Sequence, residues 1–496
     1  SSDRRSRLAE GRRGGRGRLC TGKEGTLRTR GGSEGLASAP ATRRATLTGG
    51  VALMGALAAA CTPGAAGQPP PGYSGEEAQV RVQGGISTAT GEHWDEAMAE
   101  FRAKFPKIKT TWEANPPSSD GLNWQAKLKT TMVAGTAPDI FGPWGNWFAE
   151  FLQAGQLENV EQYTRRVKAS EISDFAKWQW DAFAAFAPGV RVGLPRYINI
   201  IMLYYNKDLF DEAGVRYPNA DWTMDTYREA LVRLSRDTDG DGRRDQWGGK
   251  LSYSSWDRFQ RYVLSWGGHT VDPKDRSRCM LGAPEAQAAM QWLRDRIWKD
   301  NSMAQVAQLE ALVNDTGNYV PFYQRKIAMS EEGISSIGRR FAVNMEEAGN
   351  LNWSIMHVPK GPAIRNTLGT TDGWGMWKGT KNKQATWEVL WYLAGPAFQR
   401  TNVVYSGQMP VRFSVQEDYK RILRQQWPTL EQVDLDVALE AQKLGYPRDN
   451  ENFTDQQRAM ELIDPALDRV FDEGTEPVRV FVDLCQQVSA NQPRTG

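Results

Sequence analysis

The stretch Asp237-Thr-Asp-Gly-Asp-Gly-Arg-Arg-Asp245 has the residue types of a cation-binding loop. Counted from Asp237, carboxylates occupy positions 1, 3, 5 and 9 and a glycine occupies position 6, as in an EF-hand calcium loop. Position 12 is Gly248, where that loop has a bidentate glutamate. The four aspartates therefore predict at most a weak, partly hydrated Ca²⁺ site, and the alternative is a metal-free turn between a helix and a strand. The predicted ligands are Asp237, Asp239, Asp241 and Asp245.

Other residues that could carry catalysis are sparse. The 496-residue chain has three histidines and four cysteines, and it has no HExxH, CxxC, G-x-S-x-G or P-loop motif. A catalytic zinc site is therefore not expected, and the common hydrolases and ATPases are disfavoured. Apart from the calcium of the Asp-rich loop, no cofactor is expected. Cys279 and Cys485 are far apart, and the sequence leaves open whether they pair.

Tryptophan is unusually frequent, with 19 residues. Flat aromatic side chains pack on the apolar C–H faces of sugar rings, while polar side chains bind the hydroxyl edges. Trp144, Trp256 and Trp374 lie in loop-like stretches and are candidates for such contacts. Indoles in helical patterns are expected to be core residues instead: Trp178, Trp180, Trp292, Trp298, Trp387 and Trp391.

The elements that must position these residues begin with a βαβ unit. Residues 79–83 alternate as in a strand, a helix begins at Glu92 and stops at Pro106, and residues 108–112 form a second strand. The two strands should be parallel, with a right-handed crossover. Further elements of this α/β pattern are expected at 124–133 (helix) and 138–141 (strand).

The segment GVRVGLPRYINIIMLYYNKDLFDEAGV, residues 189–215, predicts two extended stretches at 192–195 and 200–205. Asn206 should cap a short helix that Gly214 ends. The length of the chain, about 420 residues beyond its N-terminal region, exceeds one ordinary core and predicts two lobes. Further helices are expected at 222–235 and from Gln384.

The N-terminal region has the pattern of an export signal. Arg43 and Arg44 precede 14 uncharged residues, Leu47 to Ala60, which are too few to span a bilayer. The segment resembles a twin-arginine signal, and Ala58-Ala59-Ala60-Cys61 resembles a lipoprotein cleavage box. Lipid attachment at Cys61 would tether the protein to a membrane surface. The alternative is a buried Ala-rich helix with an incidental cysteine.

The charge distribution supports removal of this leader. Residues 1–60 contain 12 Lys and Arg residues and 4 Asp and Glu residues. The remaining 436 residues therefore contain 49 basic and 55 acidic residues, a net charge of about −6. No nucleic-acid partner is therefore expected.

Five motifs occur in order along the chain: GLPRYINIIMLYYNKDLFDEAGV, DTDGDGRRDQWG, RKIAMSEEG, TKNKQATWEVLWYLAGP and SGQMPVR. Together they resemble the extracellular solute-binding proteins of ABC importers, in the sugar-binding, maltose-binding-like group called family 1. The resemblance covers Val80 to Val415 and continues more weakly to the C-terminus.

The resemblance implies an α/β, two-lobed periplasmic-binding-protein-like (type II) fold with a hinge and a ligand cleft between the lobes. The chain should leave lobe 1 near Arg196 to Met202 and return near Ile327 to Ser330. The expected organisation is a leader (1–60), a flexible tether (61–78), lobe 1 (79–200), lobe 2 (201–328), the return to lobe 1 (329–390) and a C-terminal helical region on lobe 2 and the hinge (391–496).

Loops that follow strands should hold the ligand. Asp372 and Glu332 could equally be solvated, and Arg412 could pair with an acidic neighbour. The predicted ligand-binding residues are Gly85, Ser87, Asn115, Asp120, Trp144, Trp147, Tyr197, Trp256, Glu332, Gly333, Asp372, Gly373, Trp374 and Arg412.

The resemblance implies a non-enzymatic, monomeric binding protein that captures a carbohydrate or a related polar solute, such as a glycerophosphodiester, by hinge closure. It would deliver the solute to the permease subunits of an ABC importer, from the periplasmic or outer face of the cytoplasmic membrane. A secreted glycoside hydrolase with a carboxylate pair is the alternative. A surface adhesin is a third option.

Overall fold

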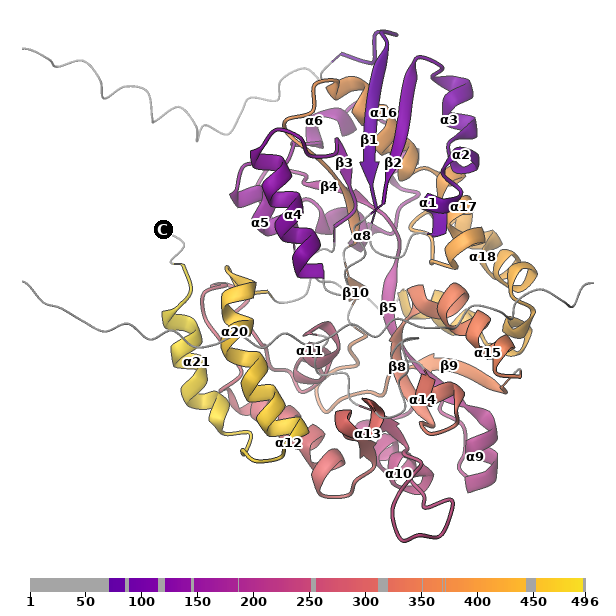
Figure 1. Ribbon diagram of the computed structural model, residues 1–496, viewed down its shortest axis with the longest axis vertical. Coiled ribbons are helices and arrows are strands. Elements are labelled where there is room, and N and C mark those ends of the chain that lie inside the picture. The colour runs from indigo at the N-terminus through magenta and orange to yellow at the C-terminus, as the bar shows by residue number, and fades with distance from the viewer. Residues whose placement is uncertain are drawn as a thin grey trace, which may run out of the picture. The chain divides into compact units, whose positions relative to one another are not determined.

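The computed structural model describes residues 71–84, 89–114, 121–143, 147–185, 187–250, 256–310, 320–349, 351–367, 369–370, 372–442 and 452–493. Within these ranges the strands form two main sheets and one short parallel pair, and helices pack around them (Figure 1). The short pair is β6 (Gly249–Lys250) with β7 (Met303–Ala304).

The first sheet has the strand order β2-β1-β3-β11-β4. β1 pairs in parallel with β2 and β3, which confirms the parallel pairing predicted for the βαβ unit. β11 is antiparallel to both β3 and β4, so β1 to β4 share one direction. Their carboxyl ends therefore lie at the same edge as the start of β11. The strands are β1 (Ala78–Gln83), β2 (Ile108–Glu113), β3 (Ile140–Phe141), β4 (Gly193–Pro195) and β11 (Gly373–Met376).

The helix predicted from Glu92 is divided into short pieces that end at Lys104, before Pro106. The side chains of Trp94, Met98 and Phe101 in this stretch are buried. The helices up to β4 are α1 (Ala89–Glu92), α2 (Trp94–Ala97), α3 (Ala99–Lys104), α4 (Gly121–Val133), α5 (Trp147–Gln153), α6 (Glu161–Thr164), α7 (Ala169–Ile172) and α8 (Lys177–Ala182).

The second sheet is built around β5, the strand predicted from the apolar run IIMLYY. β8 pairs along one edge of β5, and β9 and β10 pair along the other, all antiparallel to it. The strands are β5 (Asn199–Asn206), β8 (Met329–Gly333), β9 (Trp353–His357) and β10 (Gly369–Thr370).

Both faces of β5 are buried, which explains its nearly continuous apolar sequence. Met202 and Tyr204 belong to a hydrophobic cluster that also contains the residues of β1. Leu203 and Tyr205 belong to a second cluster, which contains α10, α12 and the last helices. Alternate residues of one strand therefore contribute to two different cores.

The end of β5 confirms the predicted helix start. The Asn206 side chain accepts a hydrogen bond from the Leu209 amide, and Gly214 ends the helix with φ 60°. The predicted helix at 222–235 is α10, with a capping box at Thr223. The elements between β5 and β11 are α9 (Lys207–Ala213), α10 (Met224–Leu234), α11 (Trp256–Ser265), α12 (Pro284–Trp298), α13 (Val306–Glu310), α14 (Val320–Tyr323), η1 (Ile334–Ser336), η2 (Ile337–Ala342) and α15 (Val343–Glu347).

The chain passes from the first sheet to the second through residues 196–198, within the segment predicted to cross. The predicted return near Ile327 to Ser330 is wrong, because β8 pairs with β5 and stays in the second sheet. The chain returns between β10 and β11. The sequence of a buried strand such as β8 does not show which strand it pairs with. The sheet that β8 joins could therefore not be predicted.

The C-terminal region is shared between the two cores. Apolar residues of α16 to α19 belong to the cluster of β1, whereas those of α20 and α21 belong to the cluster of α12. The predicted packing of 391–496 on lobe 2 therefore applies only to its last part. These elements are α16 (Lys383–Leu393), α17 (Pro396–Ser406), α18 (Phe413–Gln426), η3 (Pro428–Gln432), α19 (Asp436–Ala441), α20 (Gln456–Leu467), η5 (Asp468–Asp472) and α21 (Val480–Ala490).

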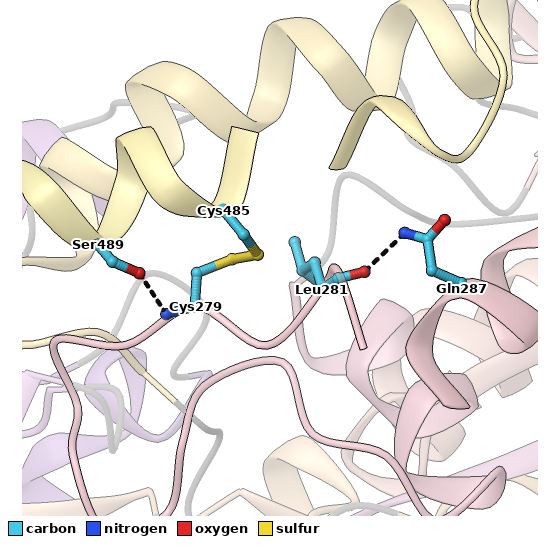
Figure 2. The surroundings of a disulfide bond; sticks show 5 residues. All are labelled: Cys279, Leu281, Gln287, Cys485 and Ser489. Carbon is cyan, nitrogen blue, oxygen red and sulfur yellow. Dashed lines mark hydrogen bonds between the residues drawn. A yellow bond between two sulfur atoms is a disulfide. The ribbon is translucent and has the colours of Figure 1, made fainter. Parts of the chain in front are cut away.

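A disulfide joins Cys279, shortly before α12, to Cys485 in α21, which answers the question that the sequence left open (Figure 2). The Ser489 hydroxyl of α21 accepts a hydrogen bond from the Cys279 amide at 2.9 Å. The last helix is thereby tied to the core of the second sheet both by a covalent bond and by a side-chain hydrogen bond.

Candidate ligand-binding site

The carboxyl edge of the first sheet is the place where the sequence predicts ligand contacts. β1, β2 and β3 each end shortly before a segment that contains predicted ligand residues. These residues lie outside the part of the chain that the structure describes, and so their roles stay predictions: Gly85, Ser87, Asn115, Asp120 and Trp144.

Three described residues from different strand ends meet at this edge. The Arg196 guanidinium, just after β4, lies over the Trp374 ring of β11 with its central carbon 4.4 Å from the ring centroid. Its Nη1 donates a long hydrogen bond, 3.4 Å, to the carbonyl of Gly142, just after β3. A Cβ added to Gly142 would lie 2.8 Å from both neighbours, so only glycine fits there without displacing them.

The neighbours of Arg196 complete the cluster. Tyr197 is buried, and the Arg196 guanidinium lies 5.4 Å from its ring centroid. Asp372 is buried too, and its carbonyl accepts a hydrogen bond from the Arg196 amide at 3.0 Å. Burial lowers the pKa of Arg196, and Tyr197 and Asp372 offset part of this effect. The structure thus brings together two predicted site residues, Tyr197 of the hinge and Asp372 of the turn before β11.

The predicted glycines Gly373 and Gly333 have close packing partners. A Cβ on Gly373 would collide with the Phe183 ring, and one on Gly333 with the Asn199 side chain. Both positions therefore require glycine for packing.

Trp147 and Arg412 lie in the interior. Trp147, predicted to bind the ligand, is only 2% exposed, and its ring packs on Trp124 with ring centroids 4.7 Å apart. Arg412 is also 2% exposed, and its Nε donates to the carbonyl of Ala394 at 2.8 Å. Its ion pair with Asp174 matches the alternative given for Arg412 in the sequence. Both side chains therefore contact other parts of the protein interior.

Glu332 belongs to a buried charge network at the end of β8. Its carboxylate forms ion pairs with Lys250, at 3.1 Å, and with Arg258 of α11, at 2.8 Å. Burial alone would raise the pKa of Glu332, but the two cations lower it below its ordinary value. Glu332 is therefore ionised and paired, which excludes the solvated alternative.

The preceding residue, Glu331, has its own partner. Arg261 of α11 is fully buried and binds the Glu331 carboxylate with Nε and Nη2, at 2.8 and 2.5 Å. The Tyr262 hydroxyl donates to the same carboxylate at 2.8 Å. Lys250, Arg258 and Arg261 were not predicted as site residues, although the spacing of the two arginines at i and i+3 places them on one face of a helix.

Trp256, the first residue of α11, is half-buried. Its ring stacks on Phe259 with centroids 5.6 Å apart and lies 6.3 Å from the Phe453 ring. Among the indoles assigned to the core, Trp180 and Trp387 are buried as predicted, whereas Trp298 is 37% exposed.

The Asp-rich loop is exposed and closed by its own hydrogen bonds. Ligand atoms of Asp237, Asp239 and Asp241 lie within 4.8 Å of one another. Asp245 is outside that group, because its carboxylate accepts from Thr238 and from Lys326, which lower its pKa to about 2. The set of four predicted ligands is thus reduced to three that lie together.

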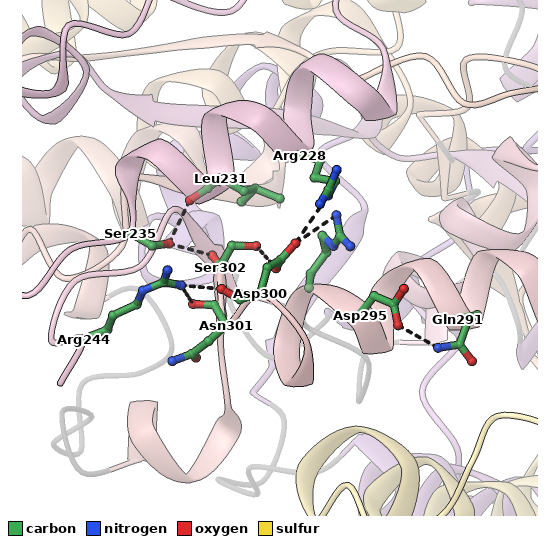
Figure 3. Close-up of polar contacts among 10 residues, drawn as sticks. Arg228, Leu231, Ser235, Arg244, Gln291, Asp295, Asp300, Asn301 and Ser302 are labelled. Atoms are coloured by element: carbon green, nitrogen blue, oxygen red, sulfur yellow. Dashed lines mark hydrogen bonds and ion pairs between the residues drawn. The ribbon is translucent and has the colours of Figure 1, made fainter. Parts of the chain in front are cut away.

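The end of this loop is anchored on the segment that follows α12 (Figure 3). Arg244 donates to the carbonyls of Asp300 and Asn301, while the Asp300 carboxylate pairs with Arg228 of α10 at 3.4 Å. The contacts account for the position of the loop without any bound ion.

The export signal and Cys61 lie outside the described residues. Among the residues that the structure does describe, no helix is both long enough and apolar enough to cross a membrane.

Comparisons with known proteins extend these observations. A binding protein of Brucella abortus (strain 2308) is 27% identical over 332 residues, which cover 66% of this chain and 74% of that protein. An ABC substrate-binding protein of Listeria monocytogenes, solved with cycloalternan, superposes with a TM-score of 0.65 at 20% identity, over 84% of this chain and 98% of that one. The sugar-binding protein MalE of Xanthomonas citri superposes with a TM-score of 0.66 at 20% identity, over 83% of this chain and 96% of that one.

The fold of the chain is therefore the two-lobed α/β fold of these structures. Residues 84–400 match the family described as bacterial extracellular solute-binding protein. This match covers more than half of the chain and includes every strand of the two sheets except β1, together with the crossing between the sheets. The protein thus belongs to the bacterial extracellular solute-binding protein family.

Proposed function

We propose that the protein captures a carbohydrate, or a related polar solute, between its two lobes and delivers it to the permease of an ABC importer. The observation that carries this proposal is the cluster of Arg196, Trp374 and Gly142 at the carboxyl edge of the first sheet. This edge adjoins residues 196–198, where the chain crosses to the second sheet. α/β sheets bind ligands beyond the carboxyl ends of their strands, and crossing segments act as hinges.

The Listeria and Xanthomonas proteins support the proposed ligand class. One was solved with a cyclic oligosaccharide, and the other is a sugar-binding protein.

A thermal-shift panel of mono- and oligosaccharides tests the proposal. A bound sugar at 100 times its Kd stabilises the folded state by about 2.7 kcal/mol, so Tm should rise by a few degrees. Chromatography of the same mixtures should recover the sugar unchanged. A panel with no shift would contradict sugar capture, and released product would indicate an enzyme.

We also propose that Cys61 carries a lipid and holds the exported protein at the membrane surface. The Arg-Arg pair, the short apolar run and the small residues before Cys61 support this proposal. Replacing Cys61 by serine should move the protein from the membrane fraction to the soluble fraction, because the acyl chains are its only predicted anchor. Cys20→Ser is the matched control and should leave the distribution unchanged. A wild-type protein found in the soluble fraction would refute the anchor.

A further inference from the structure

The backbone of Arg196 is fixed on both sides. Its amide donates to the carbonyl of Asp372 at 3.0 Å, and its carbonyl accepts from the Gln399 side chain at 2.7 Å. Its guanidinium is held against the Trp374 ring and is 5% exposed. The position of this cation is therefore set before any ligand binds.

The donors of this cluster lack acceptors within the described part of the chain. The guanidinium has five N–H donors and makes one long hydrogen bond, to Gly142. The Asp372 charge acts on the guanidinium and raises its pKa, but no described carboxylate lies within ion-pair distance of it, in contrast to Arg261, which forms an ion pair with Glu331. The Trp374 ring is 1% exposed, and its Nε1–H has no hydrogen-bond partner.

A third donor lies near the same crossing. The buried Nε1–H of Trp178, in α8, also has no partner. Trp178 lies against β10, since a Cβ on Gly369 would be 3.0 Å from its ring, and Gly369 pairs with Ile200 at the start of β5. All three groups donate only, and none of them can accept a hydrogen bond.

Groups that can only donate hydrogen bonds bind best to groups that can only accept them. A sugar hydroxyl also has a proton of its own, which needs a hydrogen-bond acceptor. The oxygens of an ionised carboxylate or a phosphate accept hydrogen bonds and have no proton to donate. Arginine stays protonated in proteins, so its buried charge calls for an anion. Planar guanidinium groups bind carboxylates and phosphates in a bidentate manner, with shorter and stronger bonds than those to neutral acceptors.

We propose that the captured solute carries an anionic group, a carboxylate or a phosphate, that binds the Arg196 guanidinium beside Trp374. The protein would then prefer an acidic sugar or a sugar phosphate to its neutral counterpart. This inference rests on the proposed capture of a carbohydrate and narrows its ligand class.

Calorimetric titration of the purified full chain at low salt tests this inference. The neutral probes are glucose and maltotriose, and the anionic probes are glucuronate, trigalacturonate and glucose 6-phosphate. We expect at least one anionic probe to bind about 10- to 100-fold tighter than the neutral sugar of the same size, as for a hydrogen-bonded charge pair. Glucuronate or trigalacturonate as the tighter ligand identifies a carboxylate, and glucose 6-phosphate identifies a phosphate.

Variants of Arg196 test whether this residue causes the preference for anionic probes. Arg196→Gln should abolish the preference, so that the Kd of the anionic probe approaches that of the neutral sugar of the same size, whereas Arg196→Lys, which keeps the charge, should retain part of the preference. Arg228→Gln removes an exposed cation of α10 and is the control for net charge. The melting temperature of each variant confirms that it is folded.

Two results would overturn the inference but leave sugar capture intact. One is a neutral probe that binds as tightly as every anionic probe, and the other is a preference for anions that persists in Arg196→Gln. If no probe bound, neutral or anionic, both the inference and the proposed function would be contradicted.

Discussion

Replacing Cys279 by serine should lower the free energy of unfolding by about 2–5 kcal/mol. The disulfide links residues that are 206 positions apart, and so it restricts the unfolded chain strongly. It also fastens α21 to the core that α12 and β5 share. Chemical denaturation of the wild-type and variant proteins, each with and without a reducing agent, measures the effect.

Reduction should destabilise the wild-type protein by a similar amount and leave Cys279→Ser unchanged. The matched control is Ser489→Ala, which keeps the disulfide and removes only the hydrogen bond from the Cys279 amide. Its cost should be about 1 kcal/mol, the usual contribution of such a bond. Equal stability of the oxidised wild-type protein and Cys279→Ser would show that the disulfide contributes nothing.

Replacing Arg261 by methionine should destabilise the protein by about 3–5 kcal/mol, because it leaves the Glu331 carboxylate buried without its cation. Arg261 and Glu331 are both buried, and two hydrogen bonds join them. The double variant Arg261→Met/Glu331→Gln removes both charges and should recover part of this loss. Denaturant unfolding of the four proteins of the cycle gives the coupling energy.

A surface pair provides the comparison. Arg228→Gln removes a half-exposed cation from Asp300, which keeps a second partner in Arg296, so the loss should be at most about 1 kcal/mol. If Arg261→Met cost no more than Arg228→Gln, the buried pair would not stabilise the fold.

Local sequence patterns predicted the elements around β5 well. The run IIMLYY has no polar alternation, which is typical of a strand covered on both faces, and Asn206 and Gly214 mark the ends of α9. The return crossing could not be predicted, since the partner of β8 depends on contacts far away in the sequence. The burial of Trp147 could not be predicted for a similar reason, since it depends on the contact of α5 with Trp124, which is distant in the sequence.

The candidate site was predicted in outline but not in its chemistry. The expected residues Tyr197, Asp372 and Trp374 do lie together at the edge of the first sheet. Arg196 was missed as a site residue because an arginine after a strand is usually solvated, and only the structure shows that it is buried without an ion pair to a described carboxylate. Arg412 presents the opposite case, since its buried charge has partners of its own.

The composition of the second core has a consequence for synthesis on the ribosome. This core combines residues 203–329 with residues 453–488, so its last third is made long after its first part. At roughly 5–20 residues per second, about 8–30 seconds pass between the synthesis of Met329 and that of Val488. During that interval the apolar faces of α10 and α12 lack the part of their core that α20 and α21 supply, and apolar surface exposed in this way is prone to aggregation.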